Sequence, residues 1–440
     1  MKRIIALALT VSLFFVAVTA CSAGDVQTLG ATSPNTQVDT QERVKFEFFE
    51  GLGSALNPVL YEIADDFNAM QNTYLIEIVS FSSYDDAFRG YQAASAAKQP
   101  PALVMGGFTD EGIKNAVDVS QFVDEDPDFS WNDYIDVYVD MCNVNGKMLG
   151  LPLFGGGYIL FYDKHKVAEL GLDPDLIFAD WQSVAKMSAD VTQKDTNGNV
   201  TYWGFSQLWY RDLLHTYSMS NGGELLSEDG KTVTVNTREW VEPWELIRKM
   251  IHEDEIMQLH HGGEGWEAWY KTLDDVLEGR ALACIGSSGD LPYVDWDIVD
   301  AHIPPSMEGK GFFSAPIALN AAIIPATASV EQQRGAFAFY KYMTSPENAA
   351  RWCAGVGTVF PNKRANDMQD YQAFLESAPY FQVLFDVNTY GQPVQLDPTN
   401  GKIYDALAKA YDQIVIEGIS AQQALDNAAA DGQRELDLIS

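Results

Sequence analysis

The sequence predicts an α/β fold of two domains, and three observations support this. Strand and helix patterns alternate from residue 44 to residue 105, which predicts a parallel sheet with helices on its faces. At 440 residues the chain is long enough for two domains of the usual size, roughly 150 residues each. No internal period of about 20–50 residues marks a repeat protein. We therefore expect a multi-domain α/β architecture in which helices cover both faces of the sheet.

The first domain begins with a strand that places Val44, Phe46 and Phe48 on one face. Asn57 is the expected N-cap of the next helix and Pro58 its first residue, because this proline lacks only an N–H that the first turn leaves unpaired. The remaining elements of this domain are expected as a strand at 74–80, a helix at 84–97 and a short buried strand at 102–105.

The later part of the chain predicts further elements. Residues 317–324 form an apolar strand that we expect to return to the first domain, and Ser329 with Gln332 predicts a capping box for the helix that follows. The other expected elements are a turn at 145–146, an aromatic strand at 158–162, turns at 195–199 and 229–230, a strand at 281–285, a helix from Ser345-Pro346 to the glycines 355 and 357, and a last helix capped by Ser420 and Gln423.

The N-terminus predicts export. Lys2 and Arg3 precede an apolar run at 4–20, and small residues lead into Cys21, which together are typical of a secretory signal. The order Val-Thr-Ala-Cys resembles the lipobox of bacterial lipoproteins, which implies that the Cys21 thiol receives a lipid. An ordinary signal peptide with a chance cysteine is the alternative. Residues 21–42 are small and polar, so we expect a flexible, lipid-anchored linker.

Net charge and cysteine spacing argue against some classes of function. The net charge is −34, which argues against nucleic acid as a partner because phosphate contacts need clustered Lys and Arg. Cys142, Cys284 and Cys353 show no CxxC pair and no zinc-like spacing. They leave two possibilities open, one disulfide with a free thiol or three buried thiols.

Motifs for catalysis, cofactors and metals are lacking. Residues 286–289, Gly-Ser-Ser-Gly, are not a nucleophile elbow, and residues 155–157 are not a phosphate-binding loop. His260, His261 and Glu264 could hold a metal, but neighbouring histidines point apart, so a surface loop is favoured. The turn at 195–199 lacks the glycine and glutamate of a calcium loop. We expect no catalytic residues, no cofactor and no metal.

Aromatic side chains give a stronger signal. The chain has 10 tryptophans, including Trp203, Trp209, Trp266 and Trp269, and the tyrosines 210 and 270 lie beside them in sequence. Such rings can stack on the apolar face of a sugar while polar groups meet its hydroxyls. Trp203 and Trp209 are the preferred candidates, because we expect both near turns. Ordinary packing is the alternative for any one of them.

Five motifs in order make the chain resemble the extracellular solute-binding proteins of ABC importers, the group that serves sugars and glycerol phosphate. The likeness covers residues 43 to 437. The first motif is Gly-Leu-Pro at 150–152 with Tyr-Ile-Leu-Phe-Tyr-Asp-Lys at 158–164. The others are Glu-Gly-Arg-Ala-Leu-Ala at 278–283, Tyr-Met-Thr-Ser-Pro-Glu-Asn-Ala-Ala at 342–350, Gly-Thr-Val-Phe-Pro at 357–361 and Ser-Ala-Gln-Gln-Ala-Leu at 420–425.

This resemblance implies a two-lobe periplasmic-binding-protein fold with crossing hinge strands and a ligand cleft between the lobes. The expected boundaries are a signal peptide at 1–20, the linker at 21–42, lobe I at 43–152 and 314–345, and lobe II at 153–313 and 346–440. It also implies a monomer that delivers a small solute to the permease subunits of an ABC transporter. The membrane is contacted through the lipid anchor only, on the outer or periplasmic side.

Within that family the chain most resembles the glycerol-phosphate-binding branch, and the resemblance implies its ligand contacts. The predicted ligand-binding residues are Glu50, Tyr84, Phe108, Gly155, Gly156, Trp203, Trp209, Ser287, Ser288, Gly289 and Phe360. Glycines stand at 155 and 156 where the branch has serines, so we expect room there for a larger ligand. Val359 replaces a tyrosine, and an arginine expected near Pro393 is missing, which weakens the case for a phosphate monoester.

The function expected from these patterns is capture of a sugar, an oligosaccharide or a glycerol-phosphate derivative outside the cytoplasmic membrane. A secreted carbohydrate-active hydrolase is the alternative, because acidic residues are abundant and a cleft is expected. No pair of carboxylates is evident on one rigid element of the sequence.

Overall fold

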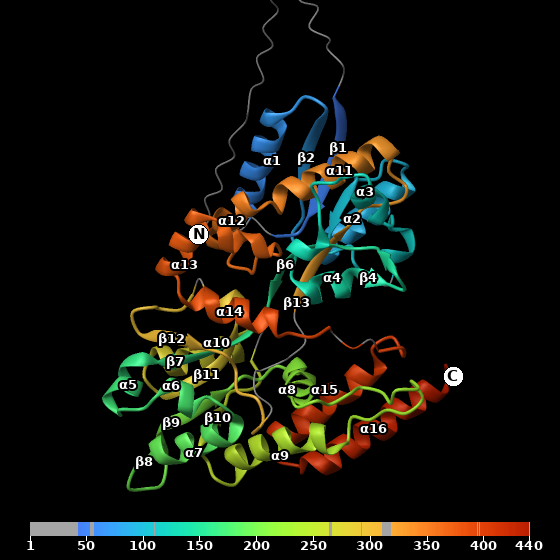
Figure 1. The fold of residues 1–440 in the computed structure, drawn as a ribbon. Coiled ribbons are helices and arrows are strands. Elements are labelled where there is room, and N and C mark those ends of the chain that lie inside the picture. The colour runs from blue at the N-terminus through green and yellow to red at the C-terminus, as the bar shows by residue number, and fades with distance from the viewer. Residues whose placement is uncertain are drawn as a thin grey trace, which may run out of the picture. The chain divides into compact units, whose positions relative to one another are not determined.

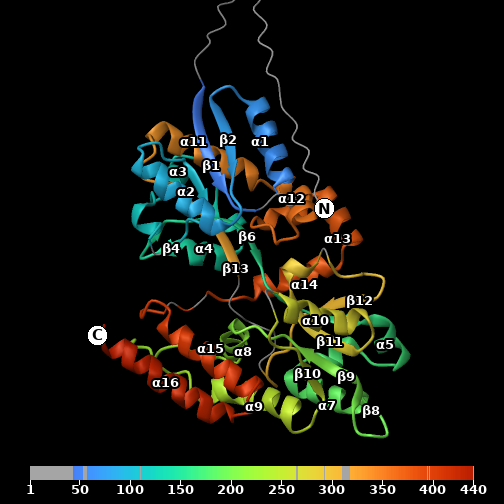
Figure 2. The ribbon, with the colours of Figure 1, turned by 180° about the vertical axis from the view of Figure 1, so that it is seen from behind.

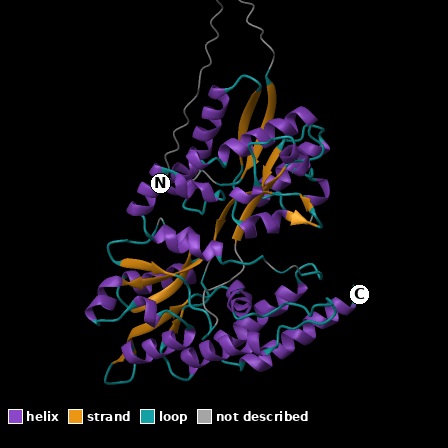
Figure 3. Cartoon of the chain, in the orientation of Figure 1, coloured by secondary structure: helices purple, strands orange, loops and turns teal. Residues whose placement is uncertain are grey.

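The structure, a computed structural model, describes residues 43–52, 57–109, 111–263, 266–291, 293–309, 318–393, 395 and 397–439. The predicted signal peptide, Cys21 and the linker lie outside these residues. The unit from Arg43 to Ser440 contains two larger sheets and the helices that cover them (Figures 1 and 3). Among the described helices none is both long and apolar enough to cross a bilayer.

The first sheet has five strands in the order β2-β1-β3-β13-β6. β1 pairs in parallel with β2 and β3, and β13 pairs antiparallel with β3 and β6. The strand expected at 317–324 therefore does return to the first sheet, as predicted. The strands are β1 (Val44–Glu50), β2 (Tyr74–Ser80), β3 (Leu103–Met105), β6 (Leu151–Gly156) and β13 (Ala318–Ile323).

Alternation along β1 explains how this sheet is covered on both faces. Phe48 points to one face and packs near Phe339, while Phe49 points to the other and packs with Tyr91. As a result α1 and α11 cover one face and α2 the other (Figure 2). The helices of this part are α1 (Pro58–Met70), α2 (Tyr84–Ala96), α3 (Ser120–Asp124), α4 (Asp136–Cys142), α11 (Val330–Met343), α12 (Ala349–Val356) and α13 (Gln369–Ser377), with a small hairpin of β4 (Asn143–Val144) and β5 (Lys147–Met148).

Of two helix caps predicted from the sequence, one is present in the structure and the other is not. The capping box of Ser329 and Gln332 is present as predicted. Asn57 stands at the N-cap position of α1, but its side chain makes no cap hydrogen bond. Its amide instead donates to Glu50 Oε1 at 3.4 Å and to Ser80 Oγ at 3.2 Å. The helix predicted after Ser345 begins with a 3-10 turn, Pro346–Asn348, and ends at Gly357 in the left-handed conformation.

The second sheet has the order β10-β9-β11-β7-β12, with β8 paired to β9. β11 lies at its centre and is apolar and buried along almost its whole length, as expected for a strand covered on both faces. The strands are β7 (Tyr158–Asp163), β8 (Gln193–Lys194), β9 (Val200–Gln207), β10 (Met257–Leu259), β11 (Ala281–Ser287) and β12 (Val299–His302).

Nine helices of the described chain accompany this second sheet. α10 packs on β11 and β9, and α8, α9, α15 and α16 contact one another in a helical layer beside it (Figure 1). The helices are α5 (Lys164–Glu169), α6 (Pro174–Ile177), α7 (Trp181–Val191), α8 (Asp212–Ser220), α9 (Arg238–His252), α10 (Glu267–Leu277), α14 (Tyr380–Thr389), α15 (Lys402–Val415) and α16 (Ala421–Asp437).

The chain passes from the first sheet to the second through Gly157, which alone separates β6 from β7. The predicted lobe boundaries stay a prediction. Those boundaries place the segment from α12 to α13 in lobe II. In the structure, α12 packs on α1, which covers the first sheet, and the Trp352 ring lies 5.5 Å from that of Phe154 in β6. Cys142, Cys284 and Cys353 are all free and buried, which settles the alternatives left open by the sequence in favour of three thiols.

Candidate functional site

The ends of three strands meet at one edge of the second sheet. β9 and β11 are parallel neighbours, so the residues that follow each of them emerge at the same edge. β7 runs antiparallel to β11 and begins there, with Tyr158 opposite Ser287. This edge therefore brings together the start of β7, the segment after β9 that leads into α8, and the Ser-Ser-Gly turn after β11.

A cavity of about 480 Å³ opens at this edge. That volume lies within the range of roughly 300–1,000 Å³ that is usual for small-molecule sites. Its walls come from three regions: an aromatic group on and before α10, the turn that follows β11, and polar side chains at the starts of β7 and α8. Its principal lining residues are Tyr158, Tyr210, Asp212, His215, Trp266, Trp269, Tyr270, Ser287, Ser288, Gly289 and Asp290.

The aromatic wall consists of Tyr210, Trp266, Trp269 and Tyr270. The Trp269 ring lies 5.3 Å from Tyr210 and 5.5 Å from Trp266, at interplanar angles of 84° and 88°. These edge-to-face contacts are a favourable arrangement of aromatic quadrupoles and hold the rings in place. Trp266 is 57% exposed and Tyr270 is 42% exposed, so their faces remain free to contact a solute.

The turn after β11 forms a polar wall fixed by its own hydrogen bonds. Ser287 and Asp290 make a capping box, in which the Ser287 backbone N–H donates to Asp290 Oδ2 at 2.7 Å. The Ser288 backbone N–H donates to the Gly157 carbonyl at 2.9 Å, which ties the turn to the start of β7. Burial raises the pKa of Asp290, and its hydrogen bonds to Ser287 and Trp269 act in the opposite direction.

Tyr158, Asp212 and His215 add a third set of polar groups. Burial raises the pKa of Tyr158 far above its usual value, and the Asp212 carboxylate adds to this effect. Burial lowers the pKa of His215, against the smaller opposing effect of Asp212, so its imidazole is neutral at pH 7. Asp212 lies in the first turn of α8, where the helix dipole favours its negative charge.

The structure brings only part of the predicted site into this cavity. Ser287, Ser288 and Gly289 line it, as predicted for the turn. Trp209 lines a smaller neighbouring cavity, and its indole N–H donates to Asp412 Oδ1 at 3.0 Å. Trp203 lies within β9, paired with Ala281, and is not part of the lining. A role for these two tryptophans in binding stays a prediction.

Glu50, at the end of β1, and Tyr84, at the start of α2, form a separate group beside the first sheet. Glu50 is fully buried and accepts hydrogen bonds from the Leu52 N–H at 2.6 Å and from the Ser80 hydroxyl. Burial first and the Glu50 charge second raise the pKa of Tyr84 to about 12, while a hydrogen bond with Asn320 opposes the shift. Neither residue lines the cavity at the second sheet.

Gly155 and Gly156 do not leave the expected room. A β-carbon at Gly155 would lie 1.7 Å from the Tyr138 hydroxyl and 2.6 Å from Asn388 Oδ1, and one at Gly156 would lie 2.5 Å from Ser288 Oγ. The space that serines would fill is therefore taken by this chain's own side chains. The expectation that these glycines enlarge the ligand site is wrong on geometric grounds, whereas their contact with ligand stays untested.

The two predicted phenylalanines, Phe108 and Phe360, lie elsewhere, among the residues that pack around the first sheet. Phe108 packs beside Gly150, whose added β-carbon would lie 2.7 Å from its ring. Phe360 is 3% exposed and belongs to the apolar core. Neither contributes to the cavity lining.

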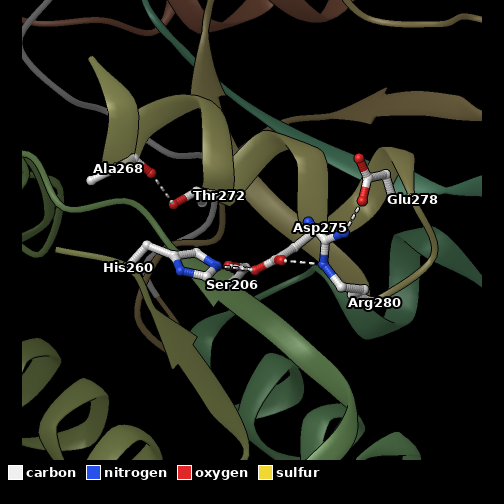
Figure 4. A network of polar contacts seen from close by, with 7 residues as sticks. All are labelled: Ser206, His260, Ala268, Thr272, Asp275, Glu278 and Arg280. Atoms are coloured by element: carbon white, nitrogen blue, oxygen red, sulfur yellow. Dashed lines mark hydrogen bonds and ion pairs between the residues drawn. The ribbon is translucent and has the colours of Figure 1, made fainter. Parts of the chain in front are cut away.

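His260, one of the residues considered from the sequence as a metal ligand, has a carboxylate partner, and Glu264 of the same candidate group lies outside the described residues. His260 Nε2 lies 2.7 Å from Asp275 Oδ2, and this buried carboxylate also accepts from Ser206 Oγ at 2.8 Å and from Arg280 Nε at 2.9 Å (Figure 4). These bonds join Asp275 of α10 to Ser206 of β9 and to Arg280, the residue before β11, so they hold in place the helix that carries Trp269 and Tyr270. Within the described residues no cluster of His, Cys, Asp or Glu is placed to hold a metal ion.

Several lining residues were not predicted as binding residues from the sequence, among them Tyr158, Asp212, His215, Thr216 and Asp290, while Tyr210, Trp266, Trp269 and Tyr270 were noted as aromatic side chains but not counted among the predicted ligand contacts. Tyr158 and Asp290 border motifs that the sequence did identify, the aromatic strand and the Ser-Ser-Gly turn. Asp212 and His215 follow Trp209 by three and six residues, so the helix after this tryptophan was a usable signal. Their convergence depends on the pairing of β9, β11 and β7, which no local pattern specifies.

Two α/β parts, one carrying an open cavity with an aromatic and a polar wall, define a ligand-binding protein of the two-lobe class. The family of bacterial extracellular solute-binding proteins matches residues 62–379, and the chain belongs to this family. It is 22% identical to the arabinooligosaccharide-binding protein of Bacillus subtilis (strain 168), over 71% of this chain and 73% of that protein. It is 23% identical to the sn-glycerol-3-phosphate-binding periplasmic protein UgpB of Yersinia pestis bv. Antiqua (strain Antiqua), over 76% and 77%.

Solved structures share the fold. The cyclic alpha-maltosyl-1,6-maltose binding protein from Arthrobacter globiformis has a TM-score of 0.74 at 15% identity, with 90% of this chain and 100% of that chain covered. UgpB from Mycobacterium tuberculosis, in complex with glycerophosphocholine, has a TM-score of 0.71 at 16% identity, with 90% and 99% covered. The predicted two-lobe solute-binding fold is confirmed.

Proposed function

We propose that this protein captures a small polyhydroxylated solute, a saccharide or a glycerophosphodiester, in the cavity at the edge of the second sheet. The observation that carries the proposal is the opposition of an aromatic wall around Trp269 to the polar turn at 287–290. Rings stack on apolar ring faces or methylenes, and the turn supplies hydrogen-bonding groups for hydroxyls. The relatives named for binding an arabinooligosaccharide and sn-glycerol-3-phosphate support a polyhydroxylated ligand in general.

A phosphate monoester is a poorer candidate. The described lining residues include no Lys or Arg, and the Arg that pairs bidentately with phosphate is what such ligands usually require. Asp212 and Asp290 would repel a dianion at the same place. A neutral or less anionic solute therefore fits the cavity better.

The protein would act outside the cytoplasmic membrane, held there by a lipid on Cys21, and would release its solute to the permease of an ABC transporter as a monomer. Export and the transporter partnership follow from the family. The anchor follows from the Val-Thr-Ala-Cys sequence before the linker. Glu50, Tyr84 and their neighbours on the first sheet would complete the site when the lobes close on ligand.

A thermal-shift screen of sugars, polyols and glycerophosphodiesters tests the proposal. A solute that binds only the folded state raises the unfolding midpoint, and at a hundredfold excess over Kd it adds about 2.7 kcal/mol of stability. The shift should be smaller in Trp269→Ala at the same solute concentration. A flat response across all three classes would contradict the proposed function.

The chain would not act as a hydrolase. Asp290 is held by hydrogen bonds from Ser287 and Trp269, which suits a structural acceptor more than an acid or base that must exchange protons. Incubation with chromogenic glycosides should give no product above the buffer rate. Turnover that disappears in Asp212→Asn would instead favour the secreted hydrolase.

A further inference from the structure

We propose that the solute carries a cationic nitrogen, and that this group lies between the Asp212 carboxylate and the aromatic wall of Tyr210, Trp266, Trp269 and Tyr270. The inference rests on the proposed function and narrows the class of ligand. It concerns an ammonium or quaternary ammonium group, either of which the same surroundings would recognise.

Charge is the first argument. Asp212 and Asp290 both line the cavity, and no described lining residue is basic. The two basic residues that adjoin the site in sequence are engaged by other carboxylates: Arg211 lies 3.5 Å from Asp412, and Lys271 lies 2.7 Å from Glu267. Within the described chain neither cavity carboxylate forms an ion pair, so a cationic group of the ligand could pair with Asp212 without displacing a basic side chain.

The aromatic faces are the second argument. A ring attracts a cation through the negative potential over its face, and tryptophan does so most strongly. Trp266 is 57% exposed and Tyr270 is 42% exposed at the cavity, although rings of this size are usually mostly buried. The rings and the carboxylates thus favour the same sign of charge, whereas stacking alone would not require acidic neighbours.

Tyr158 adds a polar group to the same cavity. Its half-buried side chain lines the cavity at the start of β7, opposite Ser287 in the strand pairing. Burial raises the pKa of this phenol, and the negative charge of Asp212 raises it further. The phenol oxygen could accept a hydrogen bond from a ligand ammonium or hydroxyl group. His215, kept neutral by burial, adds no competing positive charge.

Calorimetric titration of the full chain with two matched pairs of probes tests this inference. The pairs are glucosamine against glucose, at a mildly acidic pH that protonates the amine, and glycerophosphocholine against glycerophosphoglycerol. In at least one pair the nitrogen-bearing probe should bind about tenfold more tightly, the usual value of one charged contact. Preference in the first pair identifies an ammonium, and in the second a quaternary ammonium. The preference should weaken as salt is added.

Asp212→Asn should reduce that preference about tenfold, because the amide keeps the shape and removes the charge. Asp405→Asn is the matched control, since Asp405 also lies in the first turn of a helix but pairs with Lys402 on the surface. It should keep the preference. Equal or weaker binding of both nitrogen-bearing probes would overturn the inference. If glucose or another neutral solute still binds, the proposed function stands; if no solute of any class binds, both fail.

Discussion

The indole N–H of Trp269 donates to both carboxylate oxygens of Asp290, at 2.9 Å and 3.1 Å. This bond joins the two walls of the cavity, because Trp269 belongs to α10 and Asp290 closes the turn after β11. The same carboxylate accepts from the Ser287 backbone N–H. The stacking surface and the polar turn are thus fixed relative to each other before any solute arrives, which reduces the entropy that binding must overcome.

Asp290→Ala should loosen this site and the fold beside it. The substitution leaves the Trp269 N–H and the Ser287 N–H without their buried acceptor, which costs about 1–3 kcal/mol. We expect the free energy of unfolding in urea to fall by that amount and solute affinity to fall with it. Asp229→Ala, in a surface turn, is the control. An unchanged unfolding midpoint would show that the bond contributes nothing.

Gly155→Ala should be strongly destabilising, because its β-carbon would lie 1.7 Å from the Tyr138 hydroxyl. Overpacking of a well-filled site costs about 1–3 kcal/mol or more. Gly289→Ala is the matched comparison, since its β-carbon would meet nothing closer than 3.4 Å. Unfolding measured by circular dichroism should separate the two. Equal stability would mean that the space beside Gly155 is open after all.

His215 should make stability depend on pH. Its folded pKa lies below the ordinary value of 6.5, so below that pH the unfolded chain takes up a proton that the folded chain does not. Stability is therefore lost as the pH falls through 6.5. Between pH values just above and well below this point, wild type should lose more unfolding free energy than His215→Gln. Parallel losses in the two proteins would exclude this effect.

Cys21→Ala should release the protein from the membrane without unfolding it. The substitution removes the thiol that the lipobox would present for lipid attachment. Fractionation should find wild type with membranes after a high-salt wash and the variant in the soluble fraction, with an unchanged thermal midpoint. A variant that stays with the membrane would show that the anchor lies elsewhere.

Local sequence patterns predicted the fold well where a short segment determines its own structure. The capping box of Ser329 and the returning strand at 317–324 are examples, since their signals are hydrogen-bonding side chains and an uninterrupted apolar run. Asn57 shows the limit of this reasoning. Its residue type predicts a cap, but its amide binds Glu50 and Ser80, two residues that only the folded sheet brings within reach.

The site was predicted in part for the same reason. The turn at 287–289 was identified, but Trp209 was preferred over Trp269 because a tryptophan near a turn is a more visible signal than one on a helix. Our proposal favours Trp269 because it lines the larger cavity and bonds to Asp290, 21 residues away in sequence, a contact that no local pattern shows. Gly155 likewise suggested open space, which only the positions of Tyr138 and Asn388 could contradict.

The central claim is that the cavity walled by Trp269 is where the solute binds. Titration calorimetry of wild type, Trp269→Ala and Trp209→Ala, with the tightest solute from the screen, tests it most directly. Loss of a stacking face should cost Trp269→Ala about 1–3 kcal/mol of binding free energy, while Trp209→Ala, in the neighbouring cavity, should lose less. Wild-type affinity in Trp269→Ala, with a large loss in Trp209→Ala, would contradict the account and move the site to the neighbouring cavity.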